Sequence, residues 1–215
     1  LPPDPTITFN MHYYKTPGPG TAIDDMTMGA FKFYEPGEVV DYIVQTDLNW
    51  NRDFVIPAGH PNYEVKREMR FDEDTWLLSM GPHMHYRGKA VKMELEYPDG
   101  RRELLLHVPR YDFNWQFIYQ FKEPKLMPAG SVLHTTWWFD NSAGNPYNPD
   151  PTVDVRYGIE TYNEMANARI YFAPAKPRGI VVGGPIPEDV MARARQEEDA
   201  RRAQLERTGR LEDHD

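Results

Sequence analysis

The chain has 215 residues, of which 40% are hydrophobic and 13% aromatic, and its formal net charge is -9. This composition supports a folded core, and the acidic balance argues against nucleic acid and anionic membranes as partners. There is no cysteine, which excludes disulfides, thiolate metal sites and cysteine nucleophiles. No stretch approaches the ~18 apolar residues of a membrane-spanning helix. The chain begins without Met, so we expect a processed or partial chain.

Short segments of alternating polar and apolar residues, separated by many of the 20 prolines and 15 glycines, dominate the chain. Period-two alternation is typical of half-buried β-strands. Pro98-Asp99-Gly100 predicts a tight turn between two of them, and hence a hairpin. The sequence therefore predicts an all-β fold, an antiparallel β-sandwich. The segments expected to form strands are 7–13, 28–34, 39–46, 63–71, 75–80, 91–97, 103–108, 116–121, 131–139 and 168–172.

Three segments do not have this alternation. Residues 56–62 contain Pro and Gly and predict an interdomain connection, and residues 140–154 predict a long ordered loop. The Asn and Asp residues of the 140–154 loop favour Asx turns over a calcium-binding loop. Residues 187–208 have the composition of a charged helix, for which Pro187-Glu188-Asp189 suits the first turn and Thr208-Gly209 the end. Its apolar face is thin, so we expect weak packing on its own domain or docking on a partner.

The stretch from Gly81 to Lys89 is the most informative for function. It contains His83 and His85, which on a regular strand would point to the same face. Two imidazoles so placed can bind one metal ion, such as copper, zinc, iron or nickel. The alternative is a pair of hydrogen-bonded structural histidines. The third ligand stays open between carboxylates and four other residues: His12, His107, His134 and Met165.

The other histidines also have structural interpretations. His12 lies on the polar side of its predicted strand, where we expect a surface or interstrand hydrogen bond. His134 is surrounded by bulky residues, which favours a buried, hydrogen-bonded core histidine. His107 ends a Leu-Leu-Leu run and is interpreted as structural.

Three segments resemble the copper type II, ascorbate-dependent monooxygenases, the family of the peptidylglycine α-hydroxylating and dopamine β-monooxygenases. The first, His83–Lys89, is similar to the family's His-x-His followed by Gly-Lys. The second, Asn163–Asn167, is similar to its Glu-Met-x-Asn segment. The third, Asn10–Tyr13, is similar to the His-Tyr at the end of its N-terminal domain. The segments follow the family's order within residues 6–173.

The resemblance implies a mononuclear, oxygen-binding copper held by His83, His85 and the thioether of Met165. It also implies that His12 belongs to an electron-transfer copper site, that Asn167 contacts substrate, and that ascorbate or another donor supplies electrons. The implied fold is a pair of antiparallel jelly-roll sandwiches, in the periplasm or outside the cell. The implied division is 1–55 as the tail of the N-terminal sandwich, 56–62 as linker, 63–175 as the C-terminal copper-binding sandwich, 176–186 as loop, 187–208 as charged helix and 209–215 as tail.

The chain also departs from the family pattern. It has no His-His pair, which would supply the other two electron-transfer ligands, so we expect a second chain or an upstream domain to provide that site. Gly81 replaces a substrate-gripping arginine and Arg169 replaces a tyrosine, so a glycine-extended peptide is not the expected substrate.

The function that the resemblance implies is copper-dependent hydroxylation of a C–H bond by O2. One alternative is a non-catalytic copper-binding or structural β-sandwich subunit of a larger redox or surface assembly. Another is a metal-free sandwich that binds carbohydrate or a surface.

Overall fold

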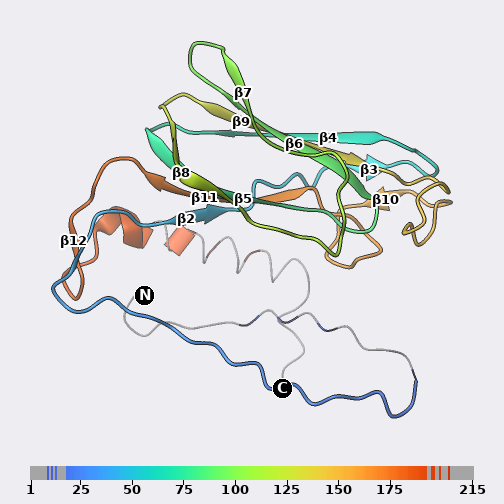
Figure 1. Cartoon of the computed structure of the whole chain (residues 1–215), viewed down its shortest axis with the longest axis horizontal. Helices are drawn as coiled ribbons and strands as arrows, with labels where there is room; N and C mark the ends of the chain where they lie inside the picture. The colour runs from blue at the N-terminus through green and yellow to red at the C-terminus, as the bar shows by residue number, and fades with distance from the viewer. Residues whose placement is uncertain are drawn as a thin grey trace. The chain divides into compact units, whose positions relative to one another are not determined.

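The larger part of the chain folds as a β-sandwich (Figure 1). The chain divides into two compact units, Leu1–Val40 with Gly179–Asp215, and Asp41–Arg178. The second unit contains two packed antiparallel sheets of four strands each, so the predicted fold class is confirmed. The computed structural model describes Phe9, Met11, Tyr13, residues 18–192, Arg195, Gln196, Asp199 and Ala203.

The first sheet has the strand order β2-β11-β5-β8. Strand β11 pairs with β5 so that Asn167 lies opposite His83 at one end and Pro174 opposite Thr75 at the other. This register brings two segments that are about 80 residues apart in the chain to the same end of the sheet. The strands are β2 (Gln45–Asp47), β11 (Asn167–Pro174), β5 (Thr75–His83) and β8 (Tyr119–Met127).

The second sheet has the strand order β4-β9-β6-β7. The predicted hairpin is confirmed between its last two strands. Gly100 has φ 82°, and the Arg101 amide donates to Asp99 Oδ1 at 2.9 Å. The left-handed backbone favours glycine at this position of the turn. The strands are β4 (Tyr63–Arg70), β9 (Val132–Phe139), β6 (Gly88–Glu96) and β7 (Arg102–Val108).

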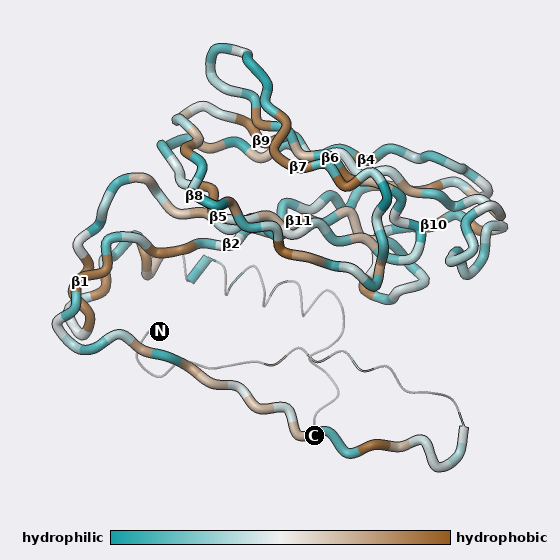
Figure 2. Tube along the Cα trace, viewed as in Figure 1, coloured by the Kyte–Doolittle hydropathy of each residue, from teal (hydrophilic) through white to brown (hydrophobic). Residues whose placement is uncertain are grey.

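The core lies between the two sheets. Val91, Met93 and Leu95 of β6 are completely buried, whereas their polar neighbours in the chain are only partly buried. Hydrophobic and hydrophilic residues are interspersed along the strands of both sheets (Figure 2). Trp137 of β9 is also buried, and its indole N–H donates to the Asn167 carbonyl at 3.0 Å. This bond joins the second sheet to the end of the first sheet at which His83 lies, so the two layers are linked beside the candidate ligands.

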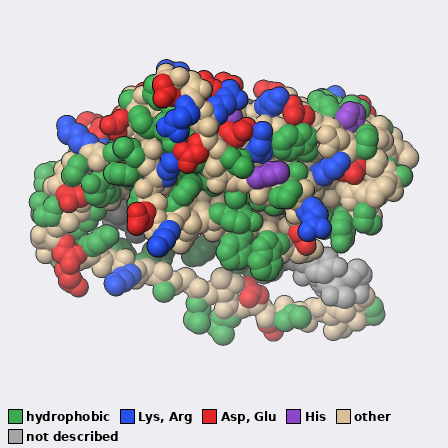
Figure 3. Space-filling view, turned by 45° about the horizontal axis from the view of Figure 1, so that its top comes forward, with side chains coloured by type: hydrophobic (Ala, Val, Ile, Leu, Met, Phe, Trp, Pro, Cys, Tyr) green, Lys and Arg blue, Asp and Glu red, His purple; other side chains and the backbone are tan. Residues whose placement is uncertain are grey.

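Ion pairs cover the outer face of the second sheet (Figure 3). Lys92 pairs with Glu94 at 2.8 Å, and Arg102 pairs with Glu96 at 2.5 Å. His134 lies on this face and contacts Glu96 at 3.0 Å. The prediction of a core position for His134 is therefore wrong, because its side chain is 17% exposed and lies among carboxylates.

A third, two-stranded sheet pairs β3 (Val55–Ile56) with β10 (Val155–Arg156). The 140–154 loop lies between β9 and β10 and contains the expected Asx turns, so that prediction is confirmed. Asp140 Oδ1 accepts from the Ser142 amide at 2.9 Å, and Asn145 Oδ1 accepts from the Tyr147 amide at 3.0 Å. In each turn a backbone amide donates a hydrogen bond to the side chain two residues earlier. Such bonds order a loop that has no hydrogen bonds to a neighbouring strand.

The smaller unit contains the pair β1 (Val39–Val40) and β12 (Ile180–Val181) and the C-terminal helix. Residues 188–192 are helical, as are the described residues 195, 196, 199 and 203. Residues 28–34 form no strand, so that prediction is wrong. Among the residues with described positions, no helix is long and apolar enough to cross a membrane. The assignment of residues 1–55 to a preceding sandwich stays a prediction.

Candidate metal centre

The two histidines of the His-x-His segment lie where the chain leaves the first sheet. Strand β5 ends at His83, and His85 follows it before β6 begins at Gly88. The imidazole centroids are 5.2 Å apart, with the ring planes at 85°. Metal–nitrogen bonds of about 2 Å with a near-tetrahedral angle place two such centroids about 5 Å apart. The spacing of the rings therefore fits two ligands of one metal ion.

Hydrogen bonds fix the tautomer of His83. Its Nδ1 lies 2.5 Å from Gln116 Oε1. The Gln116 amide nitrogen donates to the Phe113 carbonyl at 2.8 Å, which turns its oxygen toward the histidine. Because that oxygen can only accept, Nδ1 carries the proton and the lone pair lies on Nε2.

The same argument applies to His85. Its Nδ1 lies 3.2 Å from the carbonyl oxygen of Asn163. A backbone carbonyl cannot donate, so Nδ1 is again the protonated nitrogen. Metal-binding histidines usually donate their second ring N–H to a carbonyl or carboxylate in this manner. Both rings thus have the tautomer in which Nε2 can act as a ligand.

A buried carboxylate ties the two predicted ligand segments together. Glu164 is completely buried, and its Oε2 accepts from the backbone amides of His85 at 2.8 Å and Met165 at 3.2 Å. Its Oε1 accepts from the Arg87 amide at 2.6 Å. Burial raises the pKa of Glu164 to about 7, against the lowering effect of these three amides and of the Arg87 charge. Sequence analysis assigned no role to Glu164.

Met165 lies beside Asn167, the other residue of its segment that has a predicted role. The Asn167 amide nitrogen lies 3.5 Å from the Met165 sulfur. Asn167 is 8% exposed, and its Oδ1 is buried with no hydrogen-bond partner among the described residues. Since Asn167 pairs with His83 across the strands, the thioether belongs to the end of the sheet that carries the histidines. A substrate contact for Asn167 stays a prediction.

Two further residues support this corner of the sandwich, and sequence analysis missed both. Tyr111 accepts a hydrogen bond from the Met84 amide at 3.0 Å and donates one to the Met84 carbonyl at 2.8 Å. Arg87 is 1% exposed, and its guanidinium donates to Asn141 Oδ1 at 2.8 Å and to the Tyr162 carbonyl at 2.8 Å. Burial lowers the pKa of Arg87, and the nearby Glu164 charge opposes this. The sequence signal for Arg87 was its position two residues after His85, whereas Tyr111, 27 residues after Met84, had no such signal.

The other candidate ligands lie elsewhere or outside the description. His134 contacts Glu68 at 3.2 Å as well as Glu96, and His107 lies on β7 opposite Lys92. His12, the predicted remnant of an electron-transfer site, lies outside the described residues. Within the described part of the chain, no three His, Asp or Glu side chains gather in a group that could hold a metal ion. The predicted ligand set has only two such side chains, His83 and His85, because its third ligand is the thioether of Met165.

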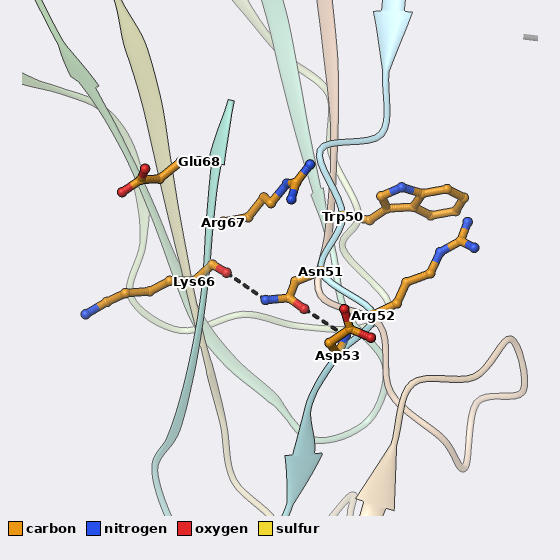
Figure 4. A pocket seen from close by; sticks show the side chains of 7 residues that line it. All are labelled: Trp50, Asn51, Arg52, Asp53, Lys66, Arg67 and Glu68. Carbon is orange, nitrogen blue, oxygen red and sulfur yellow. Dashed lines mark hydrogen bonds between the residues drawn. The ribbon is translucent and has the colours of Figure 1, made fainter. Parts of the chain in front are cut away.

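Two openings in the surface differ in their relation to the histidines. A cleft of about 660 Å³ lies between residues 50–53 and β4, where Asn51 donates to the Lys66 carbonyl at 2.7 Å (Figure 4). None of the predicted ligands lines it. A pocket of about 510 Å³ lies beside His85 and is bounded by the 109–114 and 140–147 loops. The second opening is therefore the one adjacent to the candidate metal centre.

No family model matches the chain, and no curated protein sequence matches it.

Proposed function

We propose that the chain binds one copper ion through His83, His85 and Met165 and uses it for oxygen-dependent hydroxylation of a C–H bond. The observation that carries the proposal is the pair of Nδ1 contacts, from His83 to Gln116 and from His85 to Asn163. They give both rings the same tautomer at a spacing suited to one ion. The resemblance of the three sequence segments adds the methionine and the identity of the metal.

The donor set favours copper. Imidazole binds copper, zinc and iron alike, whereas a thioether is a soft ligand that selects Cu(I). Copper, when bound, supplies the redox chemistry that activation of oxygen requires. Electrons come from ascorbate or another donor, and a second chain or an upstream domain supplies the electron-transfer site. A periplasmic or extracellular location is part of the same proposal.

The surrounding residues hold the donor atoms in place. Gln116 and the Asn163 carbonyl orient the two rings, while Glu164 holds the backbone of His85 next to that of Met165. Tyr111 fixes the backbone of the residue between the histidines. Such outer contacts keep ligands in one geometry and limit rearrangement when the metal changes its oxidation state.

Metal analysis of the purified chain tests the proposal. We expect one copper per chain after loading, and an EPR signal of a mononuclear Cu(II) centre after oxidation. His83→Ala and Met165→Leu should lower the copper content, whereas the matched control His134→Ala should leave it unchanged. A chain that binds zinc alone, or no metal, contradicts the proposal.

A second measurement separates the enzyme from the non-catalytic copper-binding alternative. The copper-loaded chain should consume oxygen when ascorbate is added, and His85→Ala should abolish the copper-dependent part of this consumption. One copper per chain without any oxygen consumption would favour the structural subunit instead.

A further inference from the structure

The pocket beside His85 has features that the metal centre does not need. Its volume of about 510 Å³ lies in the range of small-molecule sites, roughly 300–1,000 Å³. An apolar cavity of about 150 Å³ already accepts benzene. The pocket therefore has room for a ligand of one or two rings.

Aromatic side chains form much of the wall. Phe113 lies between Tyr86, at a centroid distance of 4.7 Å, and His85, at 6.2 Å, and meets both edge to face. Tyr111 lines the pocket nearby, and Tyr147, 71% exposed, also borders it. Aromatic rings prefer such tilted contacts, and a further ring can add to them.

Three charged side chains of the wall have hydrogen-bond partners within the protein. Lys89 Nζ donates to the Pro61 carbonyl at 3.0 Å. Asp140 Oδ1 accepts from the Ser142 amide at 2.9 Å, and Asp112 Oδ1 accepts from the Asn114 amide at 2.8 Å.

The formal charges of the wall cancel. Lys89 and Arg110 are balanced by Asp112 and Asp140. The pocket therefore has no net charge with which to select an ionic ligand.

We propose that this pocket binds a small uncharged aromatic molecule of one or two rings, packed against Phe113. The inference goes beyond the copper chemistry and does not depend on it, because the walls are made by protein side chains alone. Since His85 borders the pocket, an occupant would lie against a candidate metal ligand.

The experiment uses the full chain without metal and two probes that share a carbon skeleton and a hydroxyl group, 2-naphthol and its fully saturated analogue decahydro-2-naphthol. Binding is measured by isothermal titration calorimetry. We expect 2-naphthol to bind about fivefold more tightly than the saturated alcohol, because ring–ring contacts add to the burial of area. Equal affinity for the two probes, or no binding of 2-naphthol, overturns the proposal.

Two variants locate the site. Phe113→Leu keeps an apolar side chain but removes the ring, and should weaken 2-naphthol binding about fivefold. Phe117→Leu is the matched control, because Phe117 is 54% exposed and does not line the pocket. Unchanged binding in Phe113→Leu overturns the assignment. A chain that fails to bind copper but passes these tests would contradict only the proposed function.

Discussion

The hydroxyl of Tyr111 satisfies both backbone hydrogen-bonding groups of Met84, since it accepts from the amide and donates to the carbonyl. Met84 separates the two histidines of the candidate centre and is completely buried. The chain leaves the first sheet here, so no strand ladder can satisfy these groups. The Tyr111 hydroxyl therefore replaces the hydrogen bonds of a strand at Met84, the residue between the two candidate histidine ligands.

Tyr111→Phe should lower the free energy of unfolding by about 1–3 kcal/mol, because it leaves a buried amide and a buried carbonyl without a partner. Burial raises the pKa of Tyr111, so its hydroxyl stays a donor at neutral and mildly alkaline pH. Urea denaturation followed by tryptophan fluorescence measures the effect. Tyr119→Phe on β8 is the control and should change stability little.

Glu164→Gln should destabilise the chain by about 1–3 kcal/mol, because an amide oxygen cannot accept all three backbone bonds as the carboxylate does. The same change should lower the affinity for copper, since His85 and Met165 lose their shared anchor. Denaturation and copper titration measure the two effects. Glu160→Gln, at an exposed position, is the control, and equal behaviour of both variants would refute the anchoring role.

Arg87→Met should lower the free energy of unfolding by about 1–3 kcal/mol, because buried hydrogen-bonding groups lose their partner and the charge that favours ionised Glu164 is removed. It also leaves Asn141 Oδ1 and the Tyr162 carbonyl without the guanidinium donor. Arg87→Lys should rescue little of this loss, because an ammonium cannot reproduce the planar fork. Thermal unfolding measures both variants, and full rescue by lysine would show that charge alone matters.

Gly88→Ala should destabilise the chain by about 1–3 kcal/mol through overpacking. A Cβ at this position would lie 2.6 Å from the Met84 Cβ and 2.8 Å from the Tyr111 ring. The control is Gly144→Ala, for which the nearest atom, Ser142 Oγ, lies at 3.4 Å. Equal melting temperatures of the two variants would contradict the close packing at Gly88.

The last prediction concerns acid. Hydrogen bonds from Lys125 and Tyr97 hold the pKa of Glu103 below its usual value. A lowered pKa in the folded state gives stability that is present above the unfolded-state pKa and lost as the pH falls through the folded-state value. Glu103→Gln should therefore lower stability near pH 7, by less than about 1 kcal/mol, and have no effect in strong acid. Denaturation at both pH values tests this, with Glu123→Gln as the control.

Alternation in the sequence predicted the strands that pair on both sides or face the core. Strands β4, β6 and β9 lie within two or three residues of their predicted bounds, because burial imposes period two on them. The 28–34 segment alternates equally well but pairs with no strand among the described residues, and Met28 is 87% exposed. Alternation indicates which face of a strand would be buried. Whether another strand pairs with it depends on the rest of the chain.

The support of the candidate site could not be read from spacing. Gln116 lies 33 residues from His83, and Asn163 lies 78 residues from His85. The pairing of β5 with β8 brings the Gln116 segment to His83, and the pairing of β5 with β11 brings the Asn163 segment to His85. Both registers depend on the packing of the whole sheet. Local patterns could therefore identify two histidines and a methionine as candidates, but not the atoms that orient them.

The cleft beside β4 lies along the edge of the second sheet. Strand β4 is an edge strand, with β9 as its only neighbour in the part of the chain that the structure describes, and such edges can join between molecules. Asn51 covers the Lys66 carbonyl on that edge. A further strand that paired with β4 at Lys66 would therefore first have to displace the Asn51 side chain from this carbonyl.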